Sequence, residues 1–231
     1  MSERIFKLIP ALDVTDLAQA VGLVRRVDEV EGVYGYKIGF SLGLTHGLPR
    51  VVEEIRKISQ RPIIYDHQKA ATDIPDTGAL FARTLAAAGV SEAILFPQAG
   101  PATLAAWVET LAERGLKVIV GGIMTHPKYL VSEGGFLDDE RIFGVYRQAA
   151  SLGVRSFVVP MTKPELVRGV ADRLGPGSWE FYSPGLGQQG GDPARFAFLE
   201  RHYAIVGRAL LSAEDPAGYL RSVLDETRSA P

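Results

Sequence analysis

Short apolar segments alternate with longer amphipathic segments along almost the whole sequence, and this alternation is its most restrictive feature. We predict eight strands: Phe6–Leu12, Gly35–Phe40, Pro62–Tyr65, Glu92–Phe96, Lys117–Val120, Ser156–Val159, Glu180–Ser183 and Tyr203–Val206. Several of these segments are apolar throughout, as expected of parallel strands that are buried on both faces. The pattern therefore indicates a parallel sheet.

Helical periodicity fills most of the intervals between these strands. The predicted helices are Leu17–Val30, Gly78–Ala88, Ala102–Arg114, Leu137–Ser151, Pro164–Leu174, Pro193–Arg201 and Pro216–Arg228. Gly89 and Gly115 follow two of them, where a glycine commonly ends a helix. Pro164, Pro193 and Pro216 suit a first helical turn, because no hydrogen bond within the helix needs their missing N–H.

The order of these segments decides the fold class. Strands that alternate with helices pair in parallel through right-handed crossovers. Eight such units in 231 residues predict an α/β fold, a single (β/α)8 TIM barrel that forms one domain over residues 1–231. The alternative is an open doubly wound sheet, which usually has a glycine-rich phosphate loop after its first strand. The first predicted strand runs instead into Ala11-Leu12-Asp13-Val14-Thr15, which contains no glycine.

The composition excludes several classes of protein. Lys and Arg number 25 and Asp and Glu 27, so the formal net charge is −2, without the excess of cations that a nucleic-acid-binding protein needs. The absence of cysteine excludes disulfides, thiolate metal sites and a cysteine nucleophile. No apolar run approaches the ~20 residues of a membrane-spanning helix, and the first residues lack the features of a signal peptide. We therefore expect a cytoplasmic protein with neither a nucleic-acid nor a membrane partner.

Charged residues gather where the predicted strands end, which is the active-site face of such barrels. Asp13 follows the first strand, and Lys37 lies within the second. Asp66, Lys69 and Asp73 follow the third. Alternating lysines and aspartates can be buried together, because each charge offsets part of the other's desolvation. Such a network keeps a lysine charged and able to donate a proton. The alternatives are a Lys37 that points outward between helices and a solvated loop with a surface ion pair between Lys69 and Asp73.

Polar loops follow the fifth, seventh and eighth predicted strands. Met124–Phe136 is long, and Pro184–Asp192 contains four glycines and two glutamines. Glycines let the backbone approach a ligand, and glutamine can bind a phosphate oxygen or a ring amide; an ordinary flexible loop is the alternative for Pro184–Asp192. Gly207 and Arg208 begin a short helix after the last strand, and the loops after strands seven and eight usually bind phosphate in these barrels. No two histidines have metal-ligand spacing, but the carboxylates at the strand ends still allow a bound Mg²⁺ ion.

Five short motifs, in this order, resemble the orotidine 5′-phosphate decarboxylase family of homodimeric barrel enzymes. They are Ala-Leu-Asp at 11–13, Tyr-Lys-Ile-Gly at 36–39, Asp-Ile-Pro-Asp-Thr at 73–77, Met-Thr-His-Pro at 124–127 and Pro-Gly-Leu-Gly-Gln-Gln-Gly-Gly-Asp at 184–192. Each motif alone is weak or moderate, but together they span nearly the whole chain. The resemblance implies decarboxylation of orotidine 5′-phosphate to uridine 5′-phosphate, the last step of de novo pyrimidine synthesis, with neither metal nor organic cofactor.

The resemblance also implies a role for each candidate residue. Lys69 would protonate C6 of the pyrimidine as carbon dioxide leaves, and Asp66 would hold Lys69 near the substrate carboxylate. Lys37 and Asp73 would complete a Lys–Asp–Lys–Asp network, with Asp73 and Thr77 contributed by the partner subunit of a homodimer. The substrate-binding residues would be Asp13 and Lys37 at the ribose, Thr125 at the pyrimidine amide edge, Gln189, Gly207 and Arg208 at the phosphate, and Pro184, which begins the loop that closes over it.

One motif departs from the family's usual pattern, Asp-x-Lys-x-x-Asp. Here it reads Asp66-x-x-Lys69-x-x-x-Asp73, with one extra residue in each gap. Positions i and i+3 of a strand point to opposite faces. Asp66 and Lys69 can therefore converge only if the chain bulges or leaves strand geometry after Asp66. The longer gap also allows His67 or Gln68 to join the site.

Two other functions are compatible with the same barrel. The first is a related decarboxylase or aldolase that acts on a keto-sugar phosphate and uses Mg²⁺ to stabilise an enediolate. The glutamine-containing loop and Thr125 argue against it, because they suit a pyrimidine ring. The second is a non-catalytic phosphate-binding barrel in which the altered motif has lost its chemistry.

Overall fold

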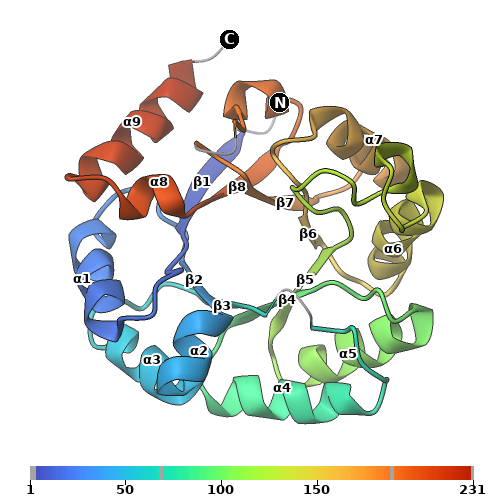
Figure 1. Ribbon diagram of the computed structural model, residues 1–231, viewed down its shortest axis with the longest axis horizontal. Helices are drawn as coiled ribbons and strands as arrows, with labels where there is room; N and C mark the ends of the chain where they lie inside the picture. The colour runs from blue at the N-terminus through green and yellow to red at the C-terminus, as the bar shows by residue number, and fades with distance from the viewer. Residues whose placement is uncertain (1–3, 68–69, 188–189, 230–231) are drawn as a thin grey trace.

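A computed structural model of the chain describes residues 4–67, 70–187 and 190–229. Within them, an eight-stranded parallel sheet consists of β1 (Ile5–Pro10), β2 (Tyr36–Gly39), β3 (Ile63–Asp66), β4 (Glu92–Leu95), β5 (Lys117–Gly121), β6 (Ser156–Val158), β7 (Glu180–Pro184) and β8 (Arg201–Val206). The strands are hydrogen-bonded in the order β1-β8-β7-β6-β5-β4-β3-β2. Seen end-on, they form a ring (Figure 1).

The ring closes between β1 and β2 through two isolated bridges. Leu8 pairs with Val33, and Ala11 pairs with Lys37. The N–H of Leu12 also donates to the carbonyl of Lys37 at 2.9 Å. The closed parallel ring confirms the predicted (β/α)8 barrel and excludes the open doubly wound sheet.

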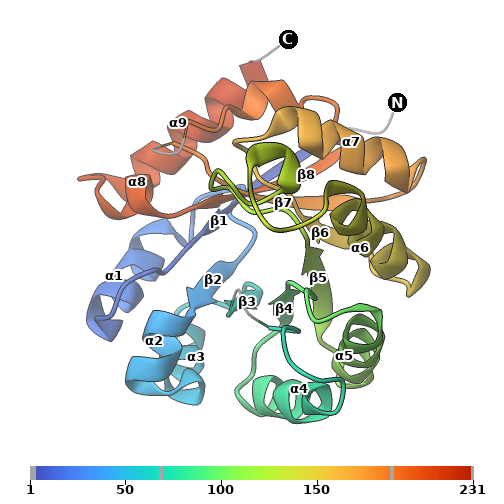
Figure 2. The ribbon, with the colours of Figure 1, turned by 45° about the vertical axis from the view of Figure 1, so that its right-hand side comes forward.

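Helices surround the ring on its outer side (Figures 1 and 2). They are α1 (Leu17–Val27), α2 (Phe40–His46), α3 (Leu48–Arg56), α4 (Thr77–Ala87), α5 (Pro101–Glu113), α6 (Asp139–Ser151), α7 (Pro164–Leu174), α8 (Arg208–Leu211) and α9 (Pro216–Ser229). Among the described residues, no helix combines the length and the apolar character needed to cross a membrane.

The helix predictions need two corrections. Pro193–Arg201 is not a helix: it contains a single 3-10 turn, η2 (Pro193–Phe196), and β8 already begins at Arg201. Its apolar spacing reflects packing on β8, where the ring of Phe196 lies 5.5 Å from that of His202. Helices α2 and α3 have no counterpart among the predicted helices, because Gly47, with a φ of 78°, divides their segment into helices of only seven and nine residues.

Buried side chains form two layers, one inside the ring and one between the ring and the helices. The inner layer includes Ile9, Ile64, Ile94, Ile119, Val158 and Ile205. The outer layer includes Leu23, Val24, Ile55, Leu85, Leu111 and Val170. Every residue of β2, β3, β4 and β6 is therefore buried, which explains the continuous apolar segments in the sequence.

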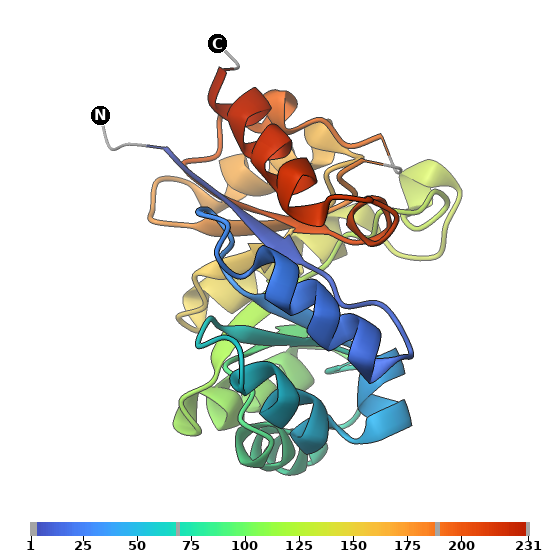
Figure 3. The ribbon, with the colours of Figure 1, turned by 90° about the vertical axis from the view of Figure 1, so that its left-hand side faces the viewer.

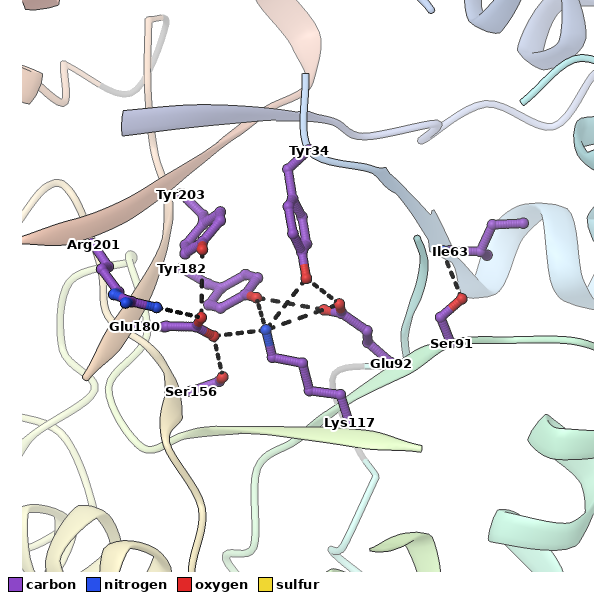
Figure 4. A network of polar contacts seen from close by, with 10 residues as sticks. All are labelled: Tyr34, Ile63, Ser91, Glu92, Lys117, Ser156, Glu180, Tyr182, Arg201 and Tyr203. Carbon is purple, nitrogen blue, oxygen red and sulfur yellow. Dashed lines mark hydrogen bonds and ion pairs between the residues drawn. The ribbon is translucent and has the colours of Figure 1, made fainter. Parts of the chain in front are cut away.

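A polar network fills the end of the barrel where the strands begin (Figure 4). Lys117 of β5 forms an ion pair with Glu180 at 2.6 Å and donates a hydrogen bond to the Tyr182 hydroxyl at 2.8 Å. Glu92 accepts a hydrogen bond from Tyr34. Burial alone would raise the pKa of Glu180, but hydrogen bonds and the charge of Lys117 outweigh it and hold the pKa below its ordinary value. Charged groups at this end of the barrel are thus paired with one another, while the cavity that contains most of the candidate residues lies at the other end.

The histidine of β8, His202, is fully buried between the rings of Phe6 and Phe196. Neither of its ring nitrogens has a hydrogen-bond partner among the described residues. Burial, together with the charge of Arg4, lowers the pKa of His202 from 6.5 to about 3. The unfolded chain therefore binds an additional proton below pH 6.5, so this contribution to stability is complete above pH 6.5 and is lost as the pH falls toward 3.

We predict that His202→Phe makes the fold less sensitive to acid. Protonation of this histidine in the unfolded chain should lower the wild-type free energy of unfolding by about 2 kcal/mol between pH 8 and pH 5. The His202→Phe variant should lack this loss, because phenylalanine does not titrate. Urea unfolding at the two pH values measures the difference, with His126→Phe at an exposed histidine as the control. The same pH dependence in wild type and His202→Phe would contradict the prediction.

Candidate active site

A cavity of about 170 Å³ opens at the end of the barrel where the strands end. In Figure 3 this face lies on the right, where the loops after β5 and β7 and helix α8 project. The lining residues are Ala11, Asp13, Lys37, Asp66, Ile94, Phe96, Ile123, Met124, Thr125, Val158, Pro184, Gly185, Leu186, Ile205, Gly207, Arg208 and Ala209. The barrel therefore brings most of the candidate residues from the sequence into one cavity.

Lys37 is the charged centre of this cavity. Its Nζ lies 3.0 Å from Oδ1 of Asp13 and 3.1 Å from Oδ2 of Asp66. The strand register explains the arrangement: Lys37 pairs with Ala11, two residues before Asp13, and Gly39 pairs with Asp66. Since residues two apart share a strand face, Lys37 and the end of β3 meet inside the ring. The lysine does not point outward between helices.

The charge of Lys37 is maintained by its two carboxylate partners. The residue is only 5% exposed, and burial alone would lower its pKa. The charges of Asp66 and Asp13, and their hydrogen bonds, outweigh burial and raise the pKa of Lys37 above its ordinary value. A charged ammonium held in this way can donate to a ligand hydroxyl, and the half-exposed carboxylate of Asp13 can accept from one.

The chain leaves strand geometry directly after Asp66, as the lengthened motif requires. β3 ends at that residue, and the buried Ala71 has a φ of 65°, a left-handed conformation that is rare for a residue with a Cβ. The carbonyl of Ala70 accepts a hydrogen bond from the N–H of Phe96 at 2.9 Å, which attaches the segment to the end of β4. Lys69, the predicted proton donor, and Gln68 lie outside the described residues.

His67 lies outside the cavity of this chain. Its Nδ1 is 2.7 Å from the hydroxyl of Tyr65. Both residues line a separate hollow beside α4, together with Leu44 and Phe81. The longer gap in the motif therefore does not bring His67 to Lys37.

Asp73 and Thr77 also lie outside this cavity. Asp73 is exposed, and its Oδ1 accepts the N–H of Ile74 at 2.7 Å. The hydroxyl of Thr77 donates to the carbonyl of Ile74 at 2.8 Å. Among the described residues, neither Asp73 nor Thr77 joins the Lys37 cluster of its own chain.

Much of the remaining wall is apolar and was not predicted from the sequence. Ile94, Phe96, Ile123, Val158 and Ile205 line it. The available signal was strand alternation, since Ile94 and Phe96 are two apart at the end of the fourth strand and share its inner face. Apolar walls around a buried ion cluster keep water out and strengthen electrostatic interactions with a ligand.

The rim of the cavity contains the loops after β7 and β8. Pro184 and Gly185 come from the first loop, and Gly207 and the exposed Arg208 come from the second. Gly207 is the N-cap of α8, and no described side chain caps it, which leaves helical N–H groups for a ligand. Gln189, predicted to bind phosphate, lies outside the described residues.

Thr125 lines the cavity from the loop after β5. The described part of the chain contains no group of three or more His, Asp or Glu side chains arranged to hold a metal ion.

Comparison with known proteins decides the family. Residues 7–223 match the family model described as "Orotidine 5'-phosphate decarboxylase / HUMPS family". The chain belongs to this family. It is 32% identical to the orotidine 5′-phosphate decarboxylase of Methanosarcina barkeri, over 95% of this chain and 93% of that protein. It is 31% identical to the orotidine 5′-phosphate decarboxylase of Methanococcoides burtonii, over 97% of this chain and 98% of that protein. Membership of the family confirms the resemblance inferred from the five motifs.

Solved structures of the family share the fold. The orotidine 5′-monophosphate decarboxylase of Methanocaldococcus jannaschii, complexed with the inhibitor BMP, has a TM-score of 0.83 and 28% identity, covering 97% of this chain and 99% of that one. The enzyme from Pyrococcus horikoshii has a TM-score of 0.80 at 26% identity.

We predict that Lys37→Met lowers the free energy of unfolding by about 3 kcal/mol, because it removes one cationic partner from the buried carboxylate of Asp66. Urea denaturation measures the change. Lys57→Met is the matched control: that lysine is exposed and pairs with Glu54 along helix α3. Its removal should cost less than about 0.5 kcal/mol. Equal losses in the two variants would show that the Lys37 cluster does not support the fold.

Proposed function

We propose that this protein decarboxylates orotidine 5′-phosphate to uridine 5′-phosphate, which makes it a carboxy-lyase of pyrimidine synthesis. The principal support is the position of Lys37, buried between Asp13 and Asp66 in the cavity of a barrel of this family. Its relatives from M. barkeri and M. burtonii are orotidine 5′-phosphate decarboxylases. We also infer a cytoplasmic location and a single barrel domain over residues 1–231.

Each part of the substrate has a complementary group at the cavity. Arg208 provides a bidentate cation, and the uncapped N–H groups beside Gly207 provide further donors, for the phosphate. The ribose hydroxyls fit Asp13 and Lys37, which offer an acceptor and a donor side by side. Thr125 faces the pyrimidine from the loop after β5, and Pro184 and Gln189 belong to the loop that closes over the phosphate.

The difficult step is the formation of a carbanion at C6 of the pyrimidine, which has no electron sink. The bond between C6 and the carboxyl carbon breaks, carbon dioxide leaves, and the electron pair stays on C6. The ammonium of Lys69 stabilises this charge and then transfers its proton to C6, with no metal or organic cofactor. Asp66 holds that ammonium in place, and remote phosphate binding supplies the energy for orientation and loop closure.

Purified protein should convert orotidine 5′-phosphate in the presence of EDTA, as followed by the loss of substrate absorbance. Lys69→Ala should lower kcat by about a thousandfold or more, because both charge stabilisation and proton donation are lost. Lys57→Ala, at the exposed lysine that follows α3, is the control. Activity that EDTA abolishes would favour the magnesium-dependent keto-sugar-phosphate reaction. Nucleotide binding without turnover would favour the non-catalytic barrel.

We also propose that the enzyme is a homodimer in which Asp73 and Thr77 serve the partner's site. Large apolar side chains are exposed on α2, on α4 and just before α4: Phe40, Leu44, Ile74 and Leu80 are 56%, 75%, 59% and 55% exposed. An exposed apolar patch of this kind marks an interaction surface. The patch, the exposed carboxylate of Asp73 and the adjacent hollow lined by Leu44 and Asp73 all support this interface.

Mixing two inactive variants tests the shared site. In a mixed dimer of Lys69→Ala and Asp73→Ala chains, one site combines an intact Lys69 with the partner's intact Asp73. Random reassortment of equal amounts should therefore restore about a quarter of wild-type activity, since half of the dimers are mixed and each has one complete site. Sedimentation should show dimers. No restored activity in proven mixed dimers would place Asp73 at the site of its own chain, or at neither.

A further inference from the structure

The segment that leaves β5, residues 122–126, enters the cavity after its pairing with β6 has ended. Its first residues are held by a side chain instead. The buried hydroxyl of Tyr146 accepts the N–H groups of Gly122 and Ile123, at 3.0 Å each, and donates to the carbonyl of Val158 at 2.9 Å. The phenol thus continues the connection between the two strands where the ladder stops.

The last residues of the segment are held by the loop between β6 and α7. The hydroxyl of Thr162 donates to the carbonyl of Thr125 at 3.1 Å, and Nζ of Lys163 donates to the carbonyl of His126 at 2.9 Å. Lys163 also pairs with Glu133 at 2.5 Å, and its side chain is only 11% exposed. We call Thr162, Lys163 and Glu133 the brace.

Glu133 ties the brace to the loop after β5 itself. Its Oε2 accepts the N–H groups of Tyr129 and Leu130 at 3.2 Å each. Burial alone would raise the pKa of Glu133, but its hydrogen bonds and the charge of Lys163 outweigh this and lower the pKa below its ordinary value. The ion pair is therefore formed at neutral pH, and its two members hold the backbone of the loop at His126, Tyr129 and Leu130.

We propose that Lys163, seated on Glu133, is a positioning residue for recognition of the substrate's base. The inference rests on the proposed function, in which Thr125 meets the amide edge of the pyrimidine. Lys163 does not line the cavity, so it acts through the backbone next to Thr125. The groups assigned to the phosphate, Gly207 and Arg208, lie on a different loop, so the brace should influence binding of the base and leave binding of the phosphate unchanged.

Two ligands separate this role from general support of the fold. Uridine 5′-phosphate contains the base, and ribose 5-phosphate lacks it. Lys163→Met should weaken binding of the nucleotide about tenfold, because Thr125 is displaced, and that of ribose 5-phosphate less than about twofold. Lys163→Arg should rescue most of the nucleotide affinity, because a guanidinium can still pair with Glu133 and donate to a carbonyl. Calorimetry measures both constants, and equal weakening of the two ligands would overturn the proposal.

A double-mutant cycle on turnover of orotidine 5′-phosphate provides the second test. Lys163→Met should lower kcat/KM about tenfold in the wild-type background and less than about twofold in Thr125→Ala, since the two residues act through one contact. Lys128→Met, at an exposed lysine of the same loop, should leave kcat/KM unchanged in both backgrounds. Melting temperatures verify that each variant is folded. If Lys163→Met lowered kcat/KM tenfold in both the wild-type and the Thr125→Ala backgrounds of an active enzyme, this inference alone would be overturned. A wild-type protein that does not turn over the nucleotide would overturn the proposed function together with it.

Discussion

The ion cluster of Lys37 with Asp13 and Asp66 is the constraint on which the rest of the active end depends. Lys37 belongs to β2 and Asp66 to β3, and Asp13 follows the end of β1, so the cluster spans the closure of the ring between β1 and β2. A buried ammonium is tolerated there only because two carboxylates lie within about 3 Å of it. The register of β2 against both neighbours must therefore be exact to a single residue, since a slip would reverse every side chain on the strand.

The opposite ends of the barrel use charge in different ways. Where the strands begin, Lys117, Glu92 and Glu180 are paired with one another or with tyrosine hydroxyls, so the network fills space (Figure 4). Where the strands end, Asp13 and Arg208 retain exposed surface next to an apolar wall. At one end the charged groups thus pair with one another, and at the other end polar groups remain available for a ligand.

Much of the fold could be predicted from the sequence, because parallel strands buried on both faces and amphipathic helices have different periods. Asp13, Lys37 and Asp66 could be placed together because charged residues at strand ends meet at one face of a barrel. Pro193–Arg201 was assigned wrongly because its apolar residues pack on β8 and not along a helix. Tyr146 and Lys163 could not be recognised, since their roles depend on hydrogen bonds to backbone groups of a distant loop, and such contacts leave no local pattern.

The two neighbours of β1 are paired to it unequally, and this affects how the chain can fold during synthesis. β1 is paired with β8 along its whole length, from Ile5 with Arg201 to Pro10 with Val206, but with β2 through only two bridges. The first strand to emerge from a ribosome therefore obtains its main neighbour last, after more than 190 further residues have been synthesised. Until then β1 presents a nearly unpaired edge to the cell. During synthesis there is thus an interval in which β2 to β7 can pair with one another while β1 still lacks its main partner, β8.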